Sequence, residues 1–215
     1  MTSSKISSLK ILLVSIAGVV GVHQFALGEE HQVSAYSHRP LVLPEFDLDD
    51  ECPVSIGDNK VVSSEHYYIF GAGGFFFGSN PVYLALSWKP WDRAEAYFEL
   101  DQRTLTSDGY RLKTPWIMHP EYRGEALVRG ARIGTDATHV IVFHENTQSQ
   151  PITANMILHS GITGTVVSSS QKRAVDAVWG FWPSSMILSE PGCYAIQIDT
   201  EKDSDIVVFE AKTDQ

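Results

Sequence analysis

The hydrophobic and polar positions near the C-terminal end of the chain alternate with a period of two. A Pro-Gly turn at residues 191–192 is followed by two alternating sets of side chains: Cys193, Ala195 and Gln197 on one side, and Tyr194, Ile196 and Ile198 on the other. Such alternation is typical of a half-buried β-strand. A second strand is predicted at residues 206–211, and the charged turn at residues 201–205 between them indicates an antiparallel hairpin.

Short apolar runs separated by turn residues continue back to residue 52. The clearest is residues 82–88, where Val82, Leu84, Leu86 and Trp88 share one face. Further strands are predicted at residues 61–70, 94–100, 110–113, 115–118, 125–134, 139–144, 155–158, 163–167 and 174–182. About ten strands without a convincing amphipathic helix or an internal repeat predict an all-β sandwich or barrel.

The N-terminal 28 residues have the features of a signal peptide. Lys5 and Lys10 precede an apolar run at residues 11–22, and Ala26-Leu27-Gly28 provides a small-x-small cleavage site. The run is shorter than the roughly 20 residues that span a bilayer, so we expect cleavage after Gly28, with an uncleaved anchor as the alternative. Residues 29–51 are predicted to form a linker or N-terminal arm, and residues 52–215 a single β-sandwich domain.

The charge of the chain limits its partners. The formal net charge of −10 becomes −12 when Lys5 and Lys10 are removed with the leader. An acidic balance of this size repels nucleic acid and anionic membrane surfaces. We therefore expect no nucleic-acid partner, and contact with a membrane only through an uncleaved signal segment.

The chain contains two cysteines, Cys52 and Cys193. Export to an oxidising compartment favours a disulfide between them, and two free buried thiols are the alternative. The bridge would close a loop of about 140 residues, for which chain entropy gives a stabilisation of a little under about 5 kcal/mol as an upper estimate.

Several short motifs resemble those of uncharacterised bacterial secreted domains with an immunoglobulin-like or fibronectin-type β-sandwich. They are Pro-Val-Tyr-Leu at residues 81–84, Lys-x-x-Trp at 113–116, Tyr-x-Gly-x-x-x-x-Arg-Gly at 122–130 and Pro-Gly-Cys-Tyr at 191–194. The resemblance implies an immunoglobulin-like β-sandwich that is secreted, periplasmic or at the cell surface, and none of the motifs is catalytic. Antibody domains place their two cysteines much closer together, so a bridge here would be of another kind.

Catalytic and metal-binding patterns are weak. His139 and His144 are five residues apart on one predicted strand, which directs them to opposite faces, and no close-spaced ligand set is present, so no metal or cofactor is predicted. No G-x-S-x-G motif occurs. We expect a protein that is not an enzyme, and the alternative is a hydrolase of an extracellular polymer that uses Glu95 and Glu99.

Three arginines cluster around the strand at residues 125–134: Arg123, Arg129 and Arg132. Arg129 shares a face with apolar residues, so the pattern favours a partly buried guanidinium held by carboxylate or carbonyl groups. The alternative is an anion-binding spot. In the arm, the run at residues 41–43 could lie along a sheet edge and serve self-assembly.

Tryptophans at strand ends are the best functional lead. We predict Trp179, Trp182, Trp91 and Trp116 as binding residues, because flat aromatic faces stack on sugar rings or on an apolar patch of a partner. Aromatic residues also close the ends of β-sandwiches, and that core role is the alternative. The sequence thus predicts a non-enzymatic binding or structural module whose ligand is a saccharide or a protein.

Overall fold

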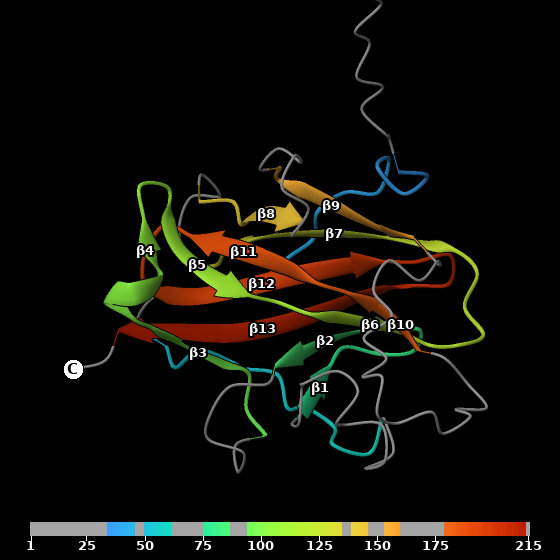
Figure 1. The fold of residues 1–215 in the computed structure, drawn as a ribbon, viewed down its shortest axis with the longest axis horizontal. Coiled ribbons are helices and arrows are strands. Elements are labelled where there is room, and N and C mark those ends of the chain that lie inside the picture. Colours follow the sequence, from blue (N-terminus) through green and yellow to red (C-terminus); the bar gives the residue numbers. More distant parts are fainter. Residues whose placement is uncertain are drawn as a thin grey trace, which may run out of the picture. The chain divides into compact units, whose positions relative to one another are not determined.

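The computed structural model describes residues 34–45, 50–61, 75–86, 94–134, 139–145, 153–159 and 179–213. These residues form thirteen strands and one short 3-10 helix (Figure 1). All of them belong to one compact body that extends from Val33 to Gln215. The predicted all-β class is therefore confirmed.

One layer of the body is a five-stranded sheet. Its order is β3 (Tyr97–Leu100), β13 (Ser204–Thr213), β12 (Gly192–Asp199), β7 (Glu125–Arg132) and β9 (Asn155–His159). β12 and β13 are the predicted hairpin, with Tyr194 opposite Phe209. All neighbours are antiparallel except β13 and β3, which run parallel.

The other layer consists of two four-stranded sheets. The chain passes from one sheet to the other between β5 and β6 and again between β10 and β11. The first contains β1 (Phe75–Phe77), β2 (Val82–Leu86), β6 (Trp116–Met118) and β10 (Gly180–Trp182). The second contains β4 (Leu105–Thr106), β5 (Gly109–Lys113), β11 (Ser184–Leu188) and β8 (Val142–Glu145), and the 3-10 helix η1 (Gln102–Thr104) precedes β4. The Thr114 N–H donates to the Ser184 carbonyl, which links the two sheets where β5 leads into β6.

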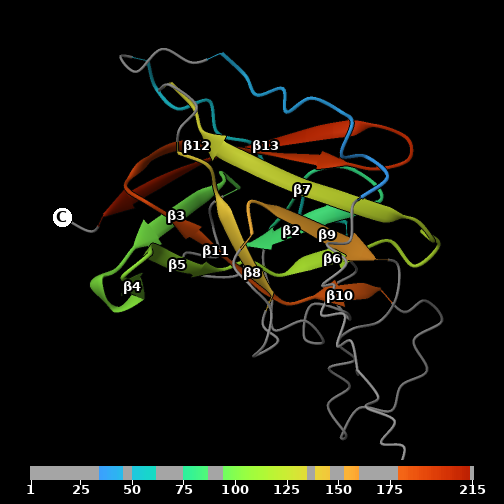
Figure 2. The ribbon, with the colours of Figure 1, turned by 90° about the horizontal axis from the view of Figure 1, so that it is seen from above.

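The hydrophobic core lies between the two layers, and one of the two alternating sets of β12 faces it. This set is Tyr194, Ile196 and Ile198, and each is at most 1% exposed. The other set, Cys193, Ala195 and Gln197, is at most 6% exposed, so the strand predicted to be half-buried is buried on both faces. Tyr194 stacks on Phe209 with ring centroids 5.5 Å apart, and Phe98 meets Phe209 edge-on at 5.1 Å. Figure 2 shows β7, β12 and β13 on one side and β5, β6, β10 and β11 on the other. The predicted sandwich-like arrangement is confirmed.

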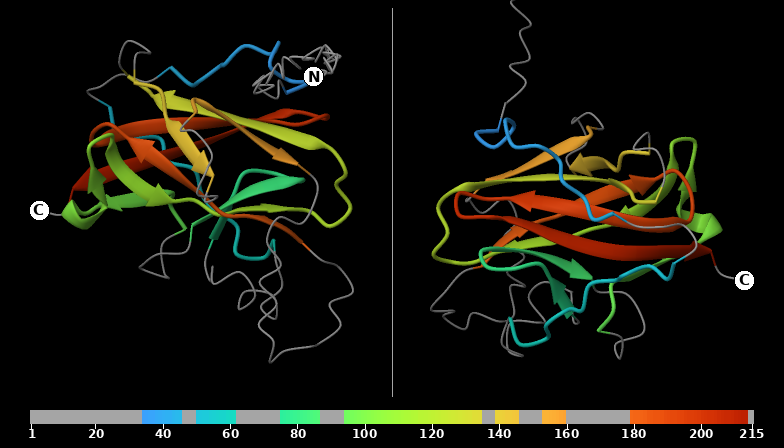
Figure 3. Two further views of the ribbon diagram at one scale, coloured as in Figure 1. Left: turned by 45° about the horizontal axis from the view of Figure 1, so that its top comes forward. Right: turned by 180° about the vertical axis from the view of Figure 1, so that it is seen from behind.

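The N-terminal arm, residues 34–45, crosses the outer face of the five-stranded sheet (Figure 3, right). The side-chain Oε1 of Gln197 accepts from the Val42 N–H at 2.7 Å, and Gln197 Nε2 donates to the Pro40 carbonyl at 3.0 Å. Gln197 belongs to the central strand β12, so residues 41–43 do not extend a sheet edge as expected. They lie across the face because a side chain, and not a strand backbone, supplies their partners.

The predicted disulfide joins Cys52 and Cys193, with Cα atoms 5.6 Å apart. It lies on the outer face of the five-stranded sheet, in a small cluster with Ile133, Ala195 and Val208. Antibody domains bridge their two sheets internally, so the expectation of a different kind of bridge is confirmed.

Several sequence predictions lie outside the described residues. These are the signal peptide at residues 1–28, Trp88, Trp91, the strand at 163–167, residues 174–178 of the strand at 174–182 and nearly all of the strand at 61–70. Within the described residues, no helix has the length and hydrophobicity needed to cross a bilayer.

Candidate functional site: an aromatic cluster outside the core

The four predicted binding tryptophans do not gather at one place. Trp116 is 0% exposed and Trp182 is 7% exposed, and both face the core from the adjacent strands β6 and β10. The Trp116 indole N–H donates to Ser184 Oγ at 3.1 Å, so it is satisfied inside the body. These two side chains fill the core, as the alternative interpretation expects, while Trp91 lies outside the described residues.

Trp179 lies on the opposite face of the same small sheet. It precedes β10 directly, is partly buried and packs against Phe76, Ala85 and Ile117. Its ring contacts two other polar aromatic rings: that of His119 edge-on at 5.2 Å and that of Tyr83 at 6.3 Å. We call Tyr83, His119, Trp179 and Phe181 the outer aromatic cluster.

Strand register brings the members of the outer aromatic cluster together. Tyr83 of β2 lies opposite Ile117 of β6, which in turn lies opposite Phe181 of β10. Side chains alternate between the faces of a strand, so Trp116 and Trp182 point inward while their neighbours Ile117 and Phe181 point outward. The sheet thus carries apolar and aromatic side chains on both faces, and the outer aromatic cluster lies on the face away from the core.

The cluster combines flat rings with hydrogen-bonding groups. Burial, together with the negative charges of Asp58 and Asp205, raises the pKa of Tyr83, so its phenol keeps its proton at neutral pH. The Glu121 N–H donates to His119 Nδ1 at 3.3 Å, which leaves the proton of a neutral imidazole on Nε2. Rings with polar tips are the side chains that stack on sugars and hydrogen-bond their hydroxyls.

The three clustered arginines are held internally. Arg129 donates to Asp199 Oδ2 at 2.5 Å and to the Arg39 carbonyl at 2.9 Å, which is the partly buried clamp that the sequence favours. Arg132 pairs with Glu190 at 2.6 Å, and Arg123 donates to the carbonyls of residues 120 and 122. The alternative of an anion-binding spot at this strand therefore has no support from the geometry.

The carboxylates of the hydrolase alternative are poorly placed for catalysis. Glu95 and Glu99 are exposed and four residues apart, Glu95 in a bridge to Ile56 and Glu99 in β3. Four residues of extended chain separate their Cα atoms by about 13 Å, whereas the two carboxyl groups of glycosidases flank the scissile bond at a separation of roughly 5–9.5 Å. Among the described residues, no group of three or more His, Cys, Asp or Glu side chains could hold a metal ion.

Sequence reasoning missed Tyr83, His119 and Phe181. Tyr83 alternates with the core residues Val82 and Leu84, which indicates only that it faces away from the core. No local signal shows that the strands at residues 82–86, 116–118 and 180–182 are neighbours, because their pairing is long-range. The strand order is therefore needed to predict the outer aromatic cluster, and the sequence does not supply it.

Comparisons with known proteins give little guidance. No protein-family model and no curated protein matches the chain. One similar solved structure is a mutant of CfaE, the CFA/I adhesin of enterotoxigenic E. coli, with 11% sequence identity and a TM-score of 0.28. The match covers 63% of this chain and 49% of the adhesin chain, so it spans about half of that protein. Nothing below rests on this likeness.

Proposed function

We propose that the protein is an exported, non-enzymatic binding module that takes a neutral saccharide at the outer aromatic cluster. The observation that carries the proposal is the packing of Trp179 against Tyr83 and His119 on the face of the small sheet away from the core. The Cys52–Cys193 disulfide supports export, because such bridges persist in oxidising compartments such as the periplasm or the extracellular space.

A neutral ligand fits the charges around the cluster. Tyr83 experiences the negative charges of Asp58 and Asp205, and the whole chain carries a net charge of −10. These charges repel an anionic ligand, whereas sugar hydroxyls can both donate to and accept from the Tyr83 phenol and can accept from His119 Nε2–H. Stacking of a pyranose on the indole of Trp179 would supply the apolar part of the contact.

Calorimetric titration of the disulfide-bonded protein with neutral oligosaccharides of glucose, galactose and N-acetylglucosamine tests the proposal. We expect one of these series to bind, and Trp179→Ala to weaken its binding by about tenfold or more, the loss of one good stacking contact. Tyr36→Ala is the matched control, because it removes an aromatic ring from the arm on the other layer and should leave affinity unchanged. Undiminished binding by Trp179→Ala would exclude the site, and no binding in any series would exclude the ligand class.

A further inference from the structure

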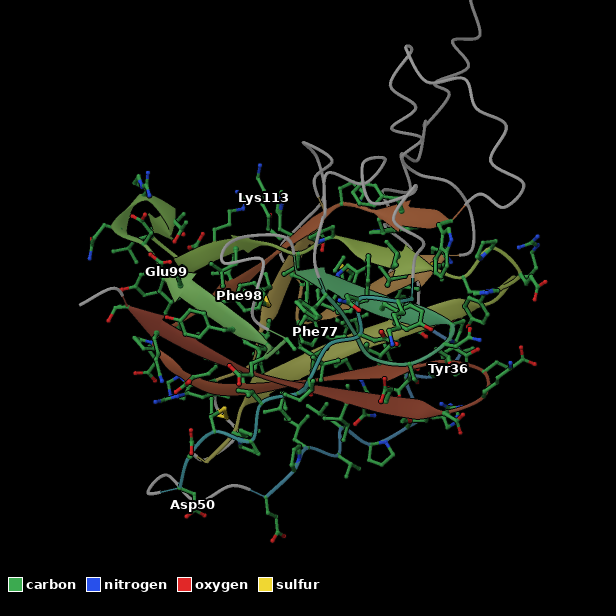
Figure 4. All side chains as sticks on the ribbon, turned by 90° about the horizontal axis from the view of Figure 1, so that it is seen from below. Tyr36, Asp50, Phe77, Phe98, Glu99 and Lys113 are labelled. Carbon is green, nitrogen blue, oxygen red and sulfur yellow. A yellow bond between two sulfur atoms is a disulfide. The ribbon has the colours of Figure 1, made fainter. Side chains whose placement is uncertain are left out.

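A second group of polar side chains lies on the outer face of the β5–β11–β8 sheet. Ser185 of β11 is opposite both Lys113 of β5 and His144 of β8, so these three form one cross-strand row. Arg111 is two residues from Lys113 and therefore shares its face. Figure 4 shows Lys113 projecting away from the ribbon. We call Arg111, Lys113, His144 and Ser185 the basic row.

The contact between Arg111 and His144 determines which ring nitrogen of His144 carries the proton. Arg111 Nη2 lies 2.5 Å from His144 Nδ1. A guanidinium only donates, so Nδ1 accepts and the imidazole is neutral with its proton on Nε2. Burial and the Arg111 charge both lower the pKa of His144, in agreement with the neutral form. The imidazole Nε2–H, the remaining guanidinium N–H groups and the Lys113 ammonium are thus available as donors.

Among the described residues, the two cations of the basic row have no acidic partner. The chain has 26 acidic and 16 basic residues, yet within its described part neither Arg111 nor Lys113 forms an ion pair. Other basic residues do: Arg129 pairs with Asp199, and Lys212 with Glu210. Neighbouring β11 adds no charged side chain to this face, where Ser185 and Ile187 are 4% and 3% exposed.

We propose that the basic row binds an oxyanion, a carboxylate or a sulfate group. The Arg111 guanidinium and the His144 Nε2–H donate to its oxygens, and Lys113 supplies a second positive charge. Guanidinium groups suit this role because their planar N–H groups match the geometry of such anions. The site is separate from the saccharide site and stands or falls independently of it.

An NMR titration of the histidine Cε1–H signals measures anion binding directly. The pH titration is carried out on the full disulfide-bonded protein in chloride, sulfate or acetate at constant ionic strength, with the His144 signal assigned by His144→Gln. We expect the pKa of His144 to be low in chloride and to rise in sulfate or acetate more than that of His38, which serves as the internal reference. Sulfate and acetate distinguish a tetrahedral anion from a planar carboxylate.

Substitutions distinguish binding of the anion at the basic row from non-specific ionic screening of the protein. Arg111→Gln should raise the pKa of His144 in chloride and remove its response to the bound anion, and Lys113→Gln should weaken anion affinity by about tenfold, the size of one charge-assisted contact. Lys202→Gln removes one exposed charge from the turn between β12 and β13 and should behave like the unmodified protein. Equal responses of His144 and His38, or an unchanged response in Arg111→Gln, would overturn the proposal.

Discussion

Asp199 is a carboxylate buried in the sheet that the arm covers. Its side chain is 0% exposed and pairs with Arg129, itself 12% exposed, at 2.5 Å. Gln197 Nε2 and Ser204 Oγ donate to its other oxygen at 2.9 and 2.5 Å. A buried ion pair contributes little to stability compared with apolar residues, but removing one partner leaves the other charge uncompensated.

Asp199→Asn should therefore destabilise the fold by about 3–5 kcal/mol, because it leaves the Arg129 guanidinium buried without its counter-ion. Urea unfolding followed by circular dichroism measures this change. Asp101→Asn is the matched control: it removes an aspartate that pairs with Arg103 on the surface, and it should leave the unfolding midpoint nearly unchanged. Equal effects of the two substitutions would contradict the buried network.

The raised pKa of Tyr122 predicts that the folded protein loses stability at high pH. Burial, with a smaller contribution from Tyr36, raises its pKa to about 12, and its hydroxyl donates to the Glu125 carbonyl. Below pH 10 both the folded and the unfolded states keep the phenol protonated. Between pH 10 and 12 only the unfolded state ionises, so the free energy of unfolding falls as the pH rises. Urea unfolding at several pH values should show a shallower fall for Tyr122→Phe, and identical slopes would contradict this assignment.

The sequence predicts that Arg129 is held by other groups of the protein, but it does not predict which residue holds it. The apolar neighbours of Arg129 indicate a clamped guanidinium, and that prediction is correct. Its partner Asp199 cannot be predicted, because the contact depends on the register in which Gln197 of β12 faces Arg129 of β7. That register is set by residues far apart in the chain.

At the scale of elements, the N-terminal arm lies across β7, β12 and β13 and is held there by hydrogen bonds. Ser34 Oγ and the Ala35 N–H both donate to Glu125 Oε1, at 2.7 and 2.6 Å, and Gln197 holds residues 40 and 42. Ser34 is only 4% exposed. In these hydrogen bonds the arm uses, apart from the Ser34 hydroxyl, backbone groups of residues 35, 40 and 42, so the polar composition that predicts a linker at residues 29–51 does not reveal the docking.

Gln197→Ala should release the middle of the arm while the body stays folded. The substitution removes the acceptor of the Val42 N–H and the donor to the Pro40 carbonyl, and each bond contributes about 0.5–1.5 kcal/mol. We expect the Val42 amide to exchange with deuterium about tenfold faster or more, whereas the amide of Ile196 in β12 should keep its protection. An unchanged Val42 rate would show that Gln197 does not hold the arm.

The period-two pattern predicts the faces of β12 and fails for β6 and β10. In β12 only one face is wholly apolar, and the predicted set that contains Tyr194 and Ile196 is the one that faces the core. In β6 and β10 both faces are apolar, with Trp116 beside Ile117 and Phe181 beside Trp182. Alternation then cannot distinguish the core from the surface. Trp116 and Trp182 are therefore predicted as binding residues together with Trp179 from their place at strand ends, and alternation cannot separate them.

At the scale of the molecule, the five-stranded layer is assembled by long-range contacts that no local pattern reveals. The parallel pair β13 and β3 unites residues 97–100 with 210–213, and the disulfide closes a separation of 141 residues. Composition and turn spacing predict a sandwich-like fold because they report the number and period of strands. Strand order decides which surfaces form, and it places the outer aromatic cluster and the basic row on different sheets.

The division of the tryptophans between core and surface is the central structural claim, because the proposed saccharide site depends on it. Paramagnetic attenuation of indole ring signals by a neutral gadolinium chelate tests this division without any ligand. The structure predicts strong attenuation at Trp179 and protection at Trp116 and Trp182. Equal protection of all three, or attenuation of Trp116 or Trp182 above that of Trp179, would contradict the account.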